Sequence, residues 1–401
     1  MEQVLYKLPD GWRYESLGKL THIVGGATPA KNQATYWGGQ IKWASVRDLH
    51  SEELLDTEFK ITEEGLKNSS TNIIPPETVV ISTRVGLGKV VITKDAVAIN
   101  QDLKGLLIKG DIEVKYLFYW LKSQAEYIKS VGTGATVKGV KLEFIKNLNC
   151  PLPKPNEQKR IVEKLDALLT RIDTAIEYLQ ESVTLADALF KSTLSSLVCD
   201  ESKDYERLSL EDLGTFSGGG TPSKSKSEFW NGEILWVTPK DMKSPMITDS
   251  ELKITKEGVS GSSAKFIPPR SLLIVARSGI LRHTLPVCIN ETECTVNQDI
   301  KVFIPSERIT SEYTQHMLKG YESFILSELV KGGVTVESLK YKDFQDFKFP
   351  VPPVEQQNRI VDELSKINQL TAPVKTELVD KIEHLKNLKA SILDSAFKGE
   401  L

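Results

Sequence analysis

The residues of this chain that could do chemistry are basic side chains and glutamine amides, and several recur at matching places in its two halves. Arg84 and Arg277 each end a run of β-branched residues and precede a turn, 193 residues apart. Gln101 and Gln298 recur within Asn-Gln-Asp. Guanidinium groups suit guanine edges and phosphates, and glutamine amides suit adenine, so DNA contact is one use for these residues. A glutamine that clamps a loop explains the recurring amide equally well.

Other basic residues could also contact phosphates or guanine edges. The candidates for DNA contact are Lys31, Arg47, Arg84, Lys89, Gln101 and Lys138 in the first half, and Lys224, Lys240, Lys265, Arg277, Arg282 and Gln298 in the second. For any single basic residue, a solvated surface is the simpler interpretation. Arg84 and Arg277 are stronger candidates than the others, because they share one repeat position.

Aromatic residues recur too, and they have two possible uses. Tyr36, Trp37 and Trp43 of the first half correspond to Phe229, Trp230 and Trp236 of the second. Aromatic rings can stack on bases. Packing in a core accounts for the same residues, and we favour that interpretation.

The usual catalytic and cofactor motifs are missing from the sequence. The glycine-rich turns at Gly25 and Gly218 lack the order of a phosphate-binding loop. A nuclease triad could be drawn from Asp102, Glu113 and Lys115, but the second half does not reproduce it. The four cysteines form no CxxC pair, and the five histidines do not correspond between the halves. We therefore expect a non-catalytic chain with no metal site and no cofactor of its own.

The matching pairs belong to a duplication of the whole sequence. Gly25-Gly26-Ala27-Thr28-Pro29 returns 193 residues later as Gly218-Gly219-Gly220-Thr221-Pro222, and Asn-Gln-Asp returns at a spacing of 197. Solenoid repeats are far shorter, so this period indicates a duplicated domain. Two related but unequal domains are suited to hold two related but unequal targets.

Each repeat is predicted to contain a β-rich part and then a long helix. Strands are expected at residues 78–83, 89–93, 106–108, 271–276 and 300–304, where β-branched and apolar residues dominate. One short helix is expected in each repeat, near residues 116–130 and 311–329. The predicted fold class is α+β, with two homologous β-rich domains separated by two long antiparallel coiled-coil helices in a pseudo-two-fold arrangement. The predicted boundaries are 1–153 and 201–352 for the domains, and 154–200 and 353–401 for the helices.

Apolar residues follow a heptad pattern along both helices. The residues predicted to pair the helices are Leu165, Leu169, Ile172, Ile176, Leu179 and Val183 in the first, and Leu378, Ile382, Leu385 and Ile392 in the second. About 38 residues of the first helix would extend about 57 Å. Pro373 should kink the second helix or restart it after Leu370, because proline lacks the N–H and clashes with the preceding turn.

Composition and charge limit the kinds of partner and the cell compartment that are expected for this chain. The 401 residues carry a net charge of −3, which gives no overall attraction to nucleic acid, but local fields decide binding and residues 84–146 are rich in lysine and arginine. The sequence starts without the pattern of a signal peptide and has no apolar run of about 18 residues, so no membrane span is expected. Unpaired cysteines suit a reducing cytoplasm.

Taken together, the motifs resemble the specificity subunit of type I restriction-modification systems. Each half carries G-G-x-T-P, W-x-x-x-x-D and N-Q-D, followed by a proline-rich hinge, Q-x-R-I-V and a long helix. The final residues, Ser391 to Leu401, are similar to the usual ending of that family. Two features depart from the pattern: the first helix lacks this ending, and Pro373 has Thr174 as its counterpart.

The resemblance implies a division of labour. Each domain would read one half of an asymmetric bipartite site on double-stranded DNA, and the helices would set the spacing and dock two modification subunits. Those methyltransferase subunits would bind S-adenosylmethionine and flip the target adenine. Restriction subunits would add translocation and cleavage with ATP and Mg²⁺.

Two other classes remain possible. A scaffold could present two protein-binding modules on a coiled coil, and salt separates this from DNA binding, because phosphate contacts make affinity fall steeply with salt. An enzyme with an unrecognised site has less support, since no catalytic group is repeated.

Overall fold

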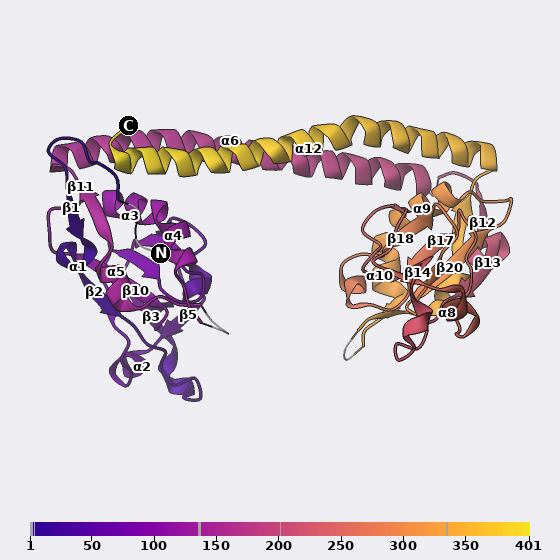
Figure 1. Ribbon diagram of the computed structural model, residues 1–401, viewed down its shortest axis with the longest axis horizontal. Coiled ribbons are helices and arrows are strands. Elements are labelled where there is room, and N and C mark those ends of the chain that lie inside the picture. The colour runs from indigo at the N-terminus through magenta and orange to yellow at the C-terminus, as the bar shows by residue number, and fades with distance from the viewer. Residues whose placement is uncertain (1–2, 4, 135–137, 201, 334–335) are drawn as a thin grey trace. The chain divides into compact units, whose positions relative to one another are not determined.

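The computed structural model describes the chain except residues 1–2, 4, 135–137, 201 and 334–335 (Figure 1). It divides into two compact units, Met1–Gln180 with Asp380–Leu401, and Glu181–Val379. Each unit contains one β-rich head and one part of each long helix. Head 1 runs from β1 (Arg13–Ser16) to β11 (Asn149–Leu152), and head 2 runs from β12 (Glu206–Ser209) to β23 (Lys348–Val351).

Head 1 contains two main sheets. The larger has the order β2 (Thr21–Gly25), β10 (Leu103–Ile108), β7 (Val79–Ser82), β8 (Val90–Thr93) and β4 (Glu53–Leu54). The smaller has the order β5 (Phe59–Ile61), β3 (Trp37–Ala44), β9 (Val97–Ile99) and β6 (Ile73–Ile74). Residues of both sheets, including Ala44, Ile74 and Val80, form one buried cluster, while β1 and β11 pair as a separate ribbon.

Head 2 repeats this topology, except that the strand matching β6 is reduced to a single bridge between Ile267 and Cys294. Its larger sheet has the order β13 (Gly214–Gly218), β20 (Ile300–Pro305), β17 (Leu272–Val275), β18 (Val287–Asn290) and β15 (Met246–Ile247). Its smaller sheet has the order β16 (Leu252–Ile254), β14 (Trp230–Val237) and β19 (Thr295–Val296). The predicted α+β class with two homologous heads is therefore confirmed, and the predicted strands are found with ends shifted by up to a few residues.

The prediction of one short helix per repeat is wrong. Head 1 has α3 (Val114–Ser123) and α4 (Ala125–Ser130), and head 2 has α9 (Ser311–Gly320) and α10 (Glu322–Glu328). A single residue separates each pair. In head 1, Tyr116, Leu117 and Trp120 of α3 are buried in the same core as Leu165 of the long helix.

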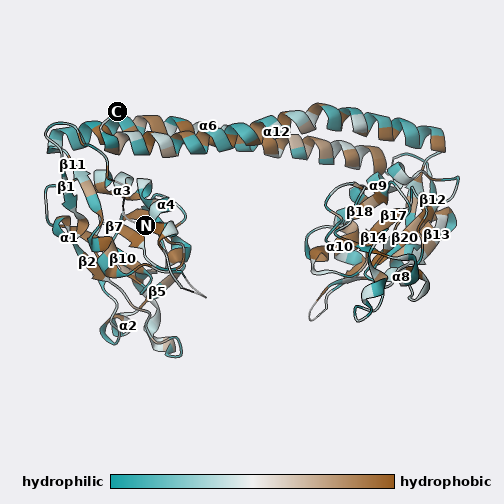
Figure 2. Cartoon of the chain, viewed as in Figure 1, coloured by the Kyte–Doolittle hydropathy of each residue, from teal (hydrophilic) through white to brown (hydrophobic). Residues whose placement is uncertain are grey.

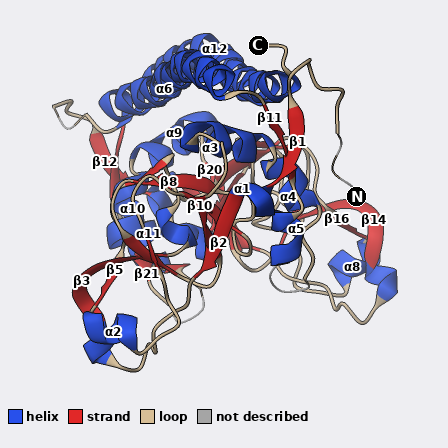
Figure 3. Cartoon of the chain, turned by 90° about the vertical axis from the view of Figure 1, so that its left-hand side faces the viewer, coloured by secondary structure: helices blue, strands red, loops and turns tan. Residues whose placement is uncertain are grey.

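The long helices are α6 (Pro155–Val198) and α12 (Val354–Lys398), and Figure 3 shows them side by side while the strands all lie in the heads. A buried glutamine joins each helix to its head. Gln158 accepts a hydrogen bond from the backbone N–H of Glu113 at 2.8 Å and donates to two carbonyls. Gln357 does the same in head 2, with Thr310 as its donor at 2.9 Å. This contact explains the glutamine of the repeated Q-x-R-I-V motif.

Within each unit, the two helix halves pack in antiparallel directions. In the first unit, Lys389 pairs with Asp173, and Leu165 and Leu169 share a core with Leu393 and Phe397 of α12. In the second unit, Lys375 pairs with Asp187. In each ion pair the residue numbers of the two partners add up to 562. A constant sum means that the antiparallel helices keep the same register in both units.

Burial along the helices follows the predicted seam, and Figure 2 shows apolar residues interspersed with polar ones. The predicted pairing residues are buried at Leu165, Leu169, Ile172, Ile176 and Ile382, and half-buried at Leu179, Val183, Leu378, Leu385 and Ile392. Of the two outcomes predicted at Pro373, a kink or a restart, the restart is wrong, because α12 continues through this residue. Pro373 and its neighbour Leu370 are exposed, so water can bond the carbonyl that loses its N–H partner.

Candidate DNA interface

A matched ion pair lies at one end of the larger sheet in each head. Strands β7 and β10 are antiparallel neighbours, so the turn after β7 and the loop before β10 meet at the same end. There, a terminal nitrogen of Arg84 lies 3.3 Å from Oδ1 of Asp102. In head 2, Nε of Arg277 donates to Oδ1 of Asp299 at 2.9 Å. The two carboxylates are mostly buried, whereas about half of each arginine side chain is exposed, at 51% and 59%.

The Asn-Gln-Asp motif holds this carboxylate in place. Asn100 donates from Nδ2 to Oδ2 of Asp102 at 3.2 Å and accepts the Asp102 backbone N–H at 3.0 Å. Asn297 makes the same two bonds with Asp299, at 3.2 and 3.1 Å. The second oxygen of each aspartate is thus taken by the asparagine, and the first faces the arginine. A charged guanidinium is therefore presented from a fixed position at the sheet end.

The glutamine of the motif links two loops. Thr28 of the G-G-x-T-P loop donates to Oε1 of Gln101 at 2.6 Å, and Thr221 donates to Oε1 of Gln298 at the same distance. A bidentate contact with adenine needs both the oxygen and the nitrogen of the amide. The oxygen is already engaged, so this structure favours the loop clamp, and DNA contact by the two glutamines stays a prediction.

Repeated tryptophans hold the G-G-x-T-P loop through hydrogen bonds to its carbonyl groups. Trp43 donates from Nε1 to the carbonyl of Ala27 at 3.0 Å, and Trp236 donates to that of Gly220 at 2.9 Å. Each of these rings meets its neighbouring tryptophan edge to face, with centroids 5.2 and 5.1 Å apart. Both rings are nearly buried. Trp43 and Trp236 therefore pack in the core, which confirms the favoured interpretation for these two rings, whereas Trp37 and Trp230 are half-buried.

The other candidate residues fall into two groups. Some engage other described groups: Lys89 donates to the carbonyl of Leu49 at 3.1 Å, Arg47 lies 3.8 Å from Glu58, and Arg282 pairs with Glu337. The remaining lysines are exposed and have no ion pair with another residue that the structure describes: Lys31, Lys138, Lys224, Lys240 and Lys265. Lys31 and Lys224 end the clamped loops, and Lys138 precedes Gly139, which packs beside Arg84. Their contact with DNA remains a prediction.

Two lysines and one glutamate near the matched ion pairs were not among the candidates taken from the sequence. Lys104 donates from Nζ to the carbonyl of Gln101 at 2.8 Å, and burial lowers the pKa of this lysine. Lys301 occupies the same place in head 2, where its Nζ lies 4.9 Å from the ring centre of Tyr341. Both lysines follow Asn-Gln-Asp by two residues, and this shared spacing was the available signal. No such signal marked Glu337, which corresponds to Lys138.

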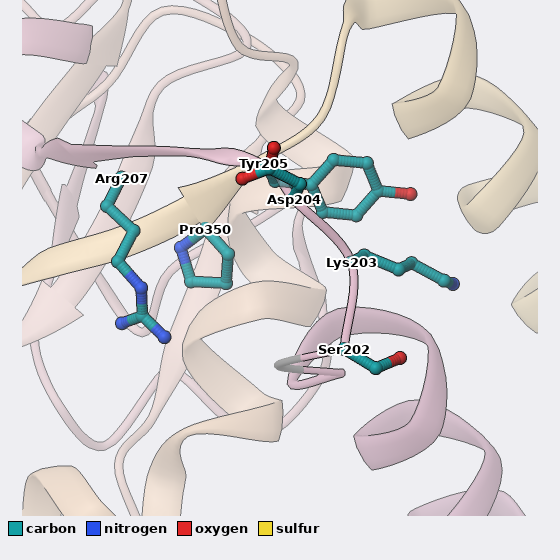
Figure 4. A pocket seen from close by; sticks show the side chains of 6 residues that line it. All are labelled: Ser202, Lys203, Asp204, Tyr205, Arg207 and Pro350. Carbon is teal, nitrogen blue, oxygen red and sulfur yellow. The ribbon is translucent and has the colours of Figure 1, made fainter.

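An open groove of about 500 Å³ lies elsewhere, at the junction of α6 and head 2 (Figure 4). It is lined by Ser202, Lys203, Asp204, Tyr205, Arg207 and Pro350. Lys203 lies 3.7 Å from Asp200, and the groove contains no histidine or cysteine. Among the described residues, no group of side chains could hold a metal ion, and no helix is long and apolar enough to cross a membrane. The matched sheet ends are therefore the stronger candidate interface.

The chain is similar in sequence to specificity subunits of known type I restriction enzymes. The specificity subunit of the type I restriction enzyme EcoR124I/EcoR124II from Escherichia coli is 34% identical over 278 residues, 67% of each chain. The MjaIX specificity subunit from Methanocaldococcus jannaschii is 25% identical over 419 residues, 98% of this chain and 94% of that one.

Solved structures share the fold. One, described as the structural basis underlying complex assembly and conformational transition of the type I R-M system, has a TM-score of 0.78 at 22% identity and covers 99% of this chain and 100% of its own. The HsdS subunit from Thermoanaerobacter tengcongensis has a TM-score of 0.53 at 22% identity, with 99% of both chains covered. The family model of the type I restriction modification DNA specificity domain matches residues 9–183 and again residues 202–384. Because these two matches span most of the sequence, the chain belongs to the family of type I restriction-modification specificity subunits.

Proposed function

We propose that each head of this specificity subunit reads one half of a bipartite DNA site with the end of its larger sheet. One observation carries the proposal: an arginine with about half of its side chain exposed is held by a mostly buried carboxylate at the same place in both heads. An arginine fork is the commonest reader of guanine in the major groove. Anchoring it in advance reduces the conformational entropy that binding must remove.

The two half-sites should differ in sequence. The loops at residues 49–58 and 243–251 are unlike each other, and Lys138 of head 1 is replaced by Glu337 in head 2. Since readout depends on the side chains at the sheet end, unequal heads give unequal half-sites. A scaffold with two protein-binding modules is not favoured, given the family to which the chain belongs.

The long helices are proposed to set the gap between the half-sites and to dock two modification subunits. Large apolar side chains are exposed on them, including Tyr178 and Leu388 in the first unit and Leu185, Leu189 and Leu370 in the second. Leu185 and Leu189 lie four positions apart and so share one face of α6, and contiguous exposed apolar surface marks protein interaction sites. Because no catalytic group is repeated in the two halves of the sequence, catalysis is assigned to the partners, which would hold S-adenosylmethionine, ATP and Mg²⁺ in the cytoplasm.

Exchange of one head tests the proposal. Residues 11–153 should be replaced by the matching head of a relative, so that β1 and β11 move together as a ribbon. Methylation mapping in a strain that carries the chimera and the modification subunit should show one half-site changed and the other kept. If both half-sites change, the heads do not read independently.

Salt dependence provides a second measurement. With six to ten phosphate contacts, affinity for the site should fall by about 10³ to 10⁵ between 50 and 200 mM salt. Affinity of the assembled complex that hardly changes over this range would contradict DNA binding through the basic sheet ends.

A further inference from the structure

Head 2 carries a second anchored arginine that head 1 lacks. In head 1 the turn between β7 and β8 spans residues 83–89. The matching turn of head 2, between β17 and β18, spans residues 276–286 and is four residues longer. The longer turn contains the short helix η4 (Gly279–Arg282). Arg282 therefore comes from a segment with no counterpart in head 1, on the same turn as Arg277.

The inserted segment is fixed at both ends. Leu281 and Leu285 are buried in the core of head 2. Oε1 of Glu322 accepts the hydroxyl of Thr284 and the backbone N–H of Leu285, both at 2.6 Å. At the other end, the backbone N–H of Ser278 donates to the carbonyl of Glu337 at 3.1 Å. A segment held in this way presents its side chains from a constant position.

Glu337 holds Arg282 through one nitrogen only. Nε of Arg282 donates to Oε1 of Glu337, whereas Oε2 is buried and has no hydrogen-bond partner within the described part of the chain. In a bidentate pair, a terminal nitrogen would occupy that second oxygen. The two terminal nitrogens are therefore not engaged by this carboxylate, and 56% of the arginine side chain is exposed. The guanidinium keeps the pKa of the Glu337 carboxyl below its ordinary value, so the carboxylate stays charged near neutral pH.

The corresponding place in head 1 has the opposite charge. Backbone contacts set the equivalence: Val140 donates to the carbonyl of Thr83 in head 1, and Leu339 donates to that of Ala276 in head 2. Two residues earlier stand Lys138 and Glu337. Head 1 thus lacks both the arginine and the carboxylate that would hold it.

We propose that Arg282 reads a guanine in the half-site of head 2, in addition to any base read by Arg277, and that Glu337 is its positioning residue. The proposal rests on the proposed function, that the sheet ends read DNA. The two terminal nitrogens of Arg282, which Glu337 does not engage, match the O6 and N7 acceptors of guanine. A phosphate contact would need only the charge, which a lysine supplies equally well.

The test uses the full chain assembled with its modification subunit. Bound duplexes are selected from a pool with randomised sequence and then sequenced, which gives both half-sites. In Arg282→Lys, preference for guanine at one position of one half-site should fall by roughly 5- to 140-fold. Glu337→Ala should lose the same preference, and the double variant should lose no more than either single one. Glu337→Gln replaces Glu337→Ala if the latter does not fold.

The matched control is Arg308→Lys. Arg308 is also a half-exposed arginine of head 2 in an ion pair, with Glu206 at 2.7 Å, but its carbonyl binds Gln357 near the start of α12. This variant should select the wild-type site. If Arg282→Lys keeps guanine at every position, or weakens all sequences equally, the inference is overturned while the proposed function stands. If the wild-type complex selects no sequence at all, both are overturned.

Discussion

A single methyl group at Gly26 should displace the clamped loop of head 1. The backbone N–H of Ala27 donates to the carbonyl of Ile99 at 3.1 Å, which brings the loop against β9. A Cβ on Gly26 would lie 1.8 Å from that oxygen, whereas contacts of this kind stay above 3.0 Å. Gly26→Ala must therefore move the loop and weaken its bonds to Ile99, Trp43 and Gln101.

The expected cost follows from those contacts. Overpacking of this kind destabilises a protein by about 1–3 kcal/mol. For a unit of about 200 residues, each kcal/mol should lower the melting temperature by about 2–4 °C. Tryptophan fluorescence is a suitable probe, because Trp37 and Trp43 bond to this loop. Affinity for the half-site of head 1 should fall as well, since Lys31 lies at the end of the loop.

The neighbouring glycine is the matched control. A Cβ on Gly25 would come no closer than 3.6 Å to Nζ of Lys104, so Gly25→Ala should unfold like the wild type. Head 2 repeats the pair: Gly219→Ala would place Cβ 1.9 Å from the carbonyl of Val296, and Gly218→Ala would meet nothing nearer than 3.8 Å. Equal melting temperatures for Gly26→Ala and Gly25→Ala would refute this account of the loop.

Three further results are expected. Arg84→Ala and Arg277→Ala should each weaken specific binding by about 1–3 kcal/mol in titrations of the complex with its own site, and unchanged affinity would leave these arginines a structural role only. Four residues inserted after Leu179, matched by four after Ile382 to keep the register, add about 6 Å of helix. Methylation mapping should then show a gap changed by one or two base pairs of about 3.4 Å each, and an unchanged gap would mean that the helices do not set it. The pure chain, given DNA, S-adenosylmethionine, ATP and Mg²⁺, should neither methylate nor cleave, and activity that survives further purification would contradict this.

The sequence determined the features that depend on local pattern. The duplication follows from motifs such as G-G-x-T-P at Gly25 and Gly218, and the long helices follow from apolar residues at heptad spacing. Strands such as Val79–Ser82 and Leu272–Val275 were predicted because short runs of β-branched residues suit a buried strand. These features can be predicted since neighbouring residues in the chain decide them.

Where local pattern and packing compete, the sequence misled. Pro373 was expected to kink α12 or restart it, but the helix continues through this exposed position, where water can bond the carbonyl that loses its N–H partner. The single helix expected near residues 116–130 is two, divided at Gln124. Local propensity sets only a preference, which solvent at an exposed position or packing in the core can override.

Only the tertiary structure decided what the repeated polar residues do. Arg84 and Asp102 were both visible as repeated residues, but the fold brings them within 3.3 Å across 18 positions of sequence. Glu337 carried no signal, and it meets Arg282 across 55 residues. Spacing along a chain does not fix which side chains meet at the end of a sheet. That depends on strand order and register, which arise when the whole core packs.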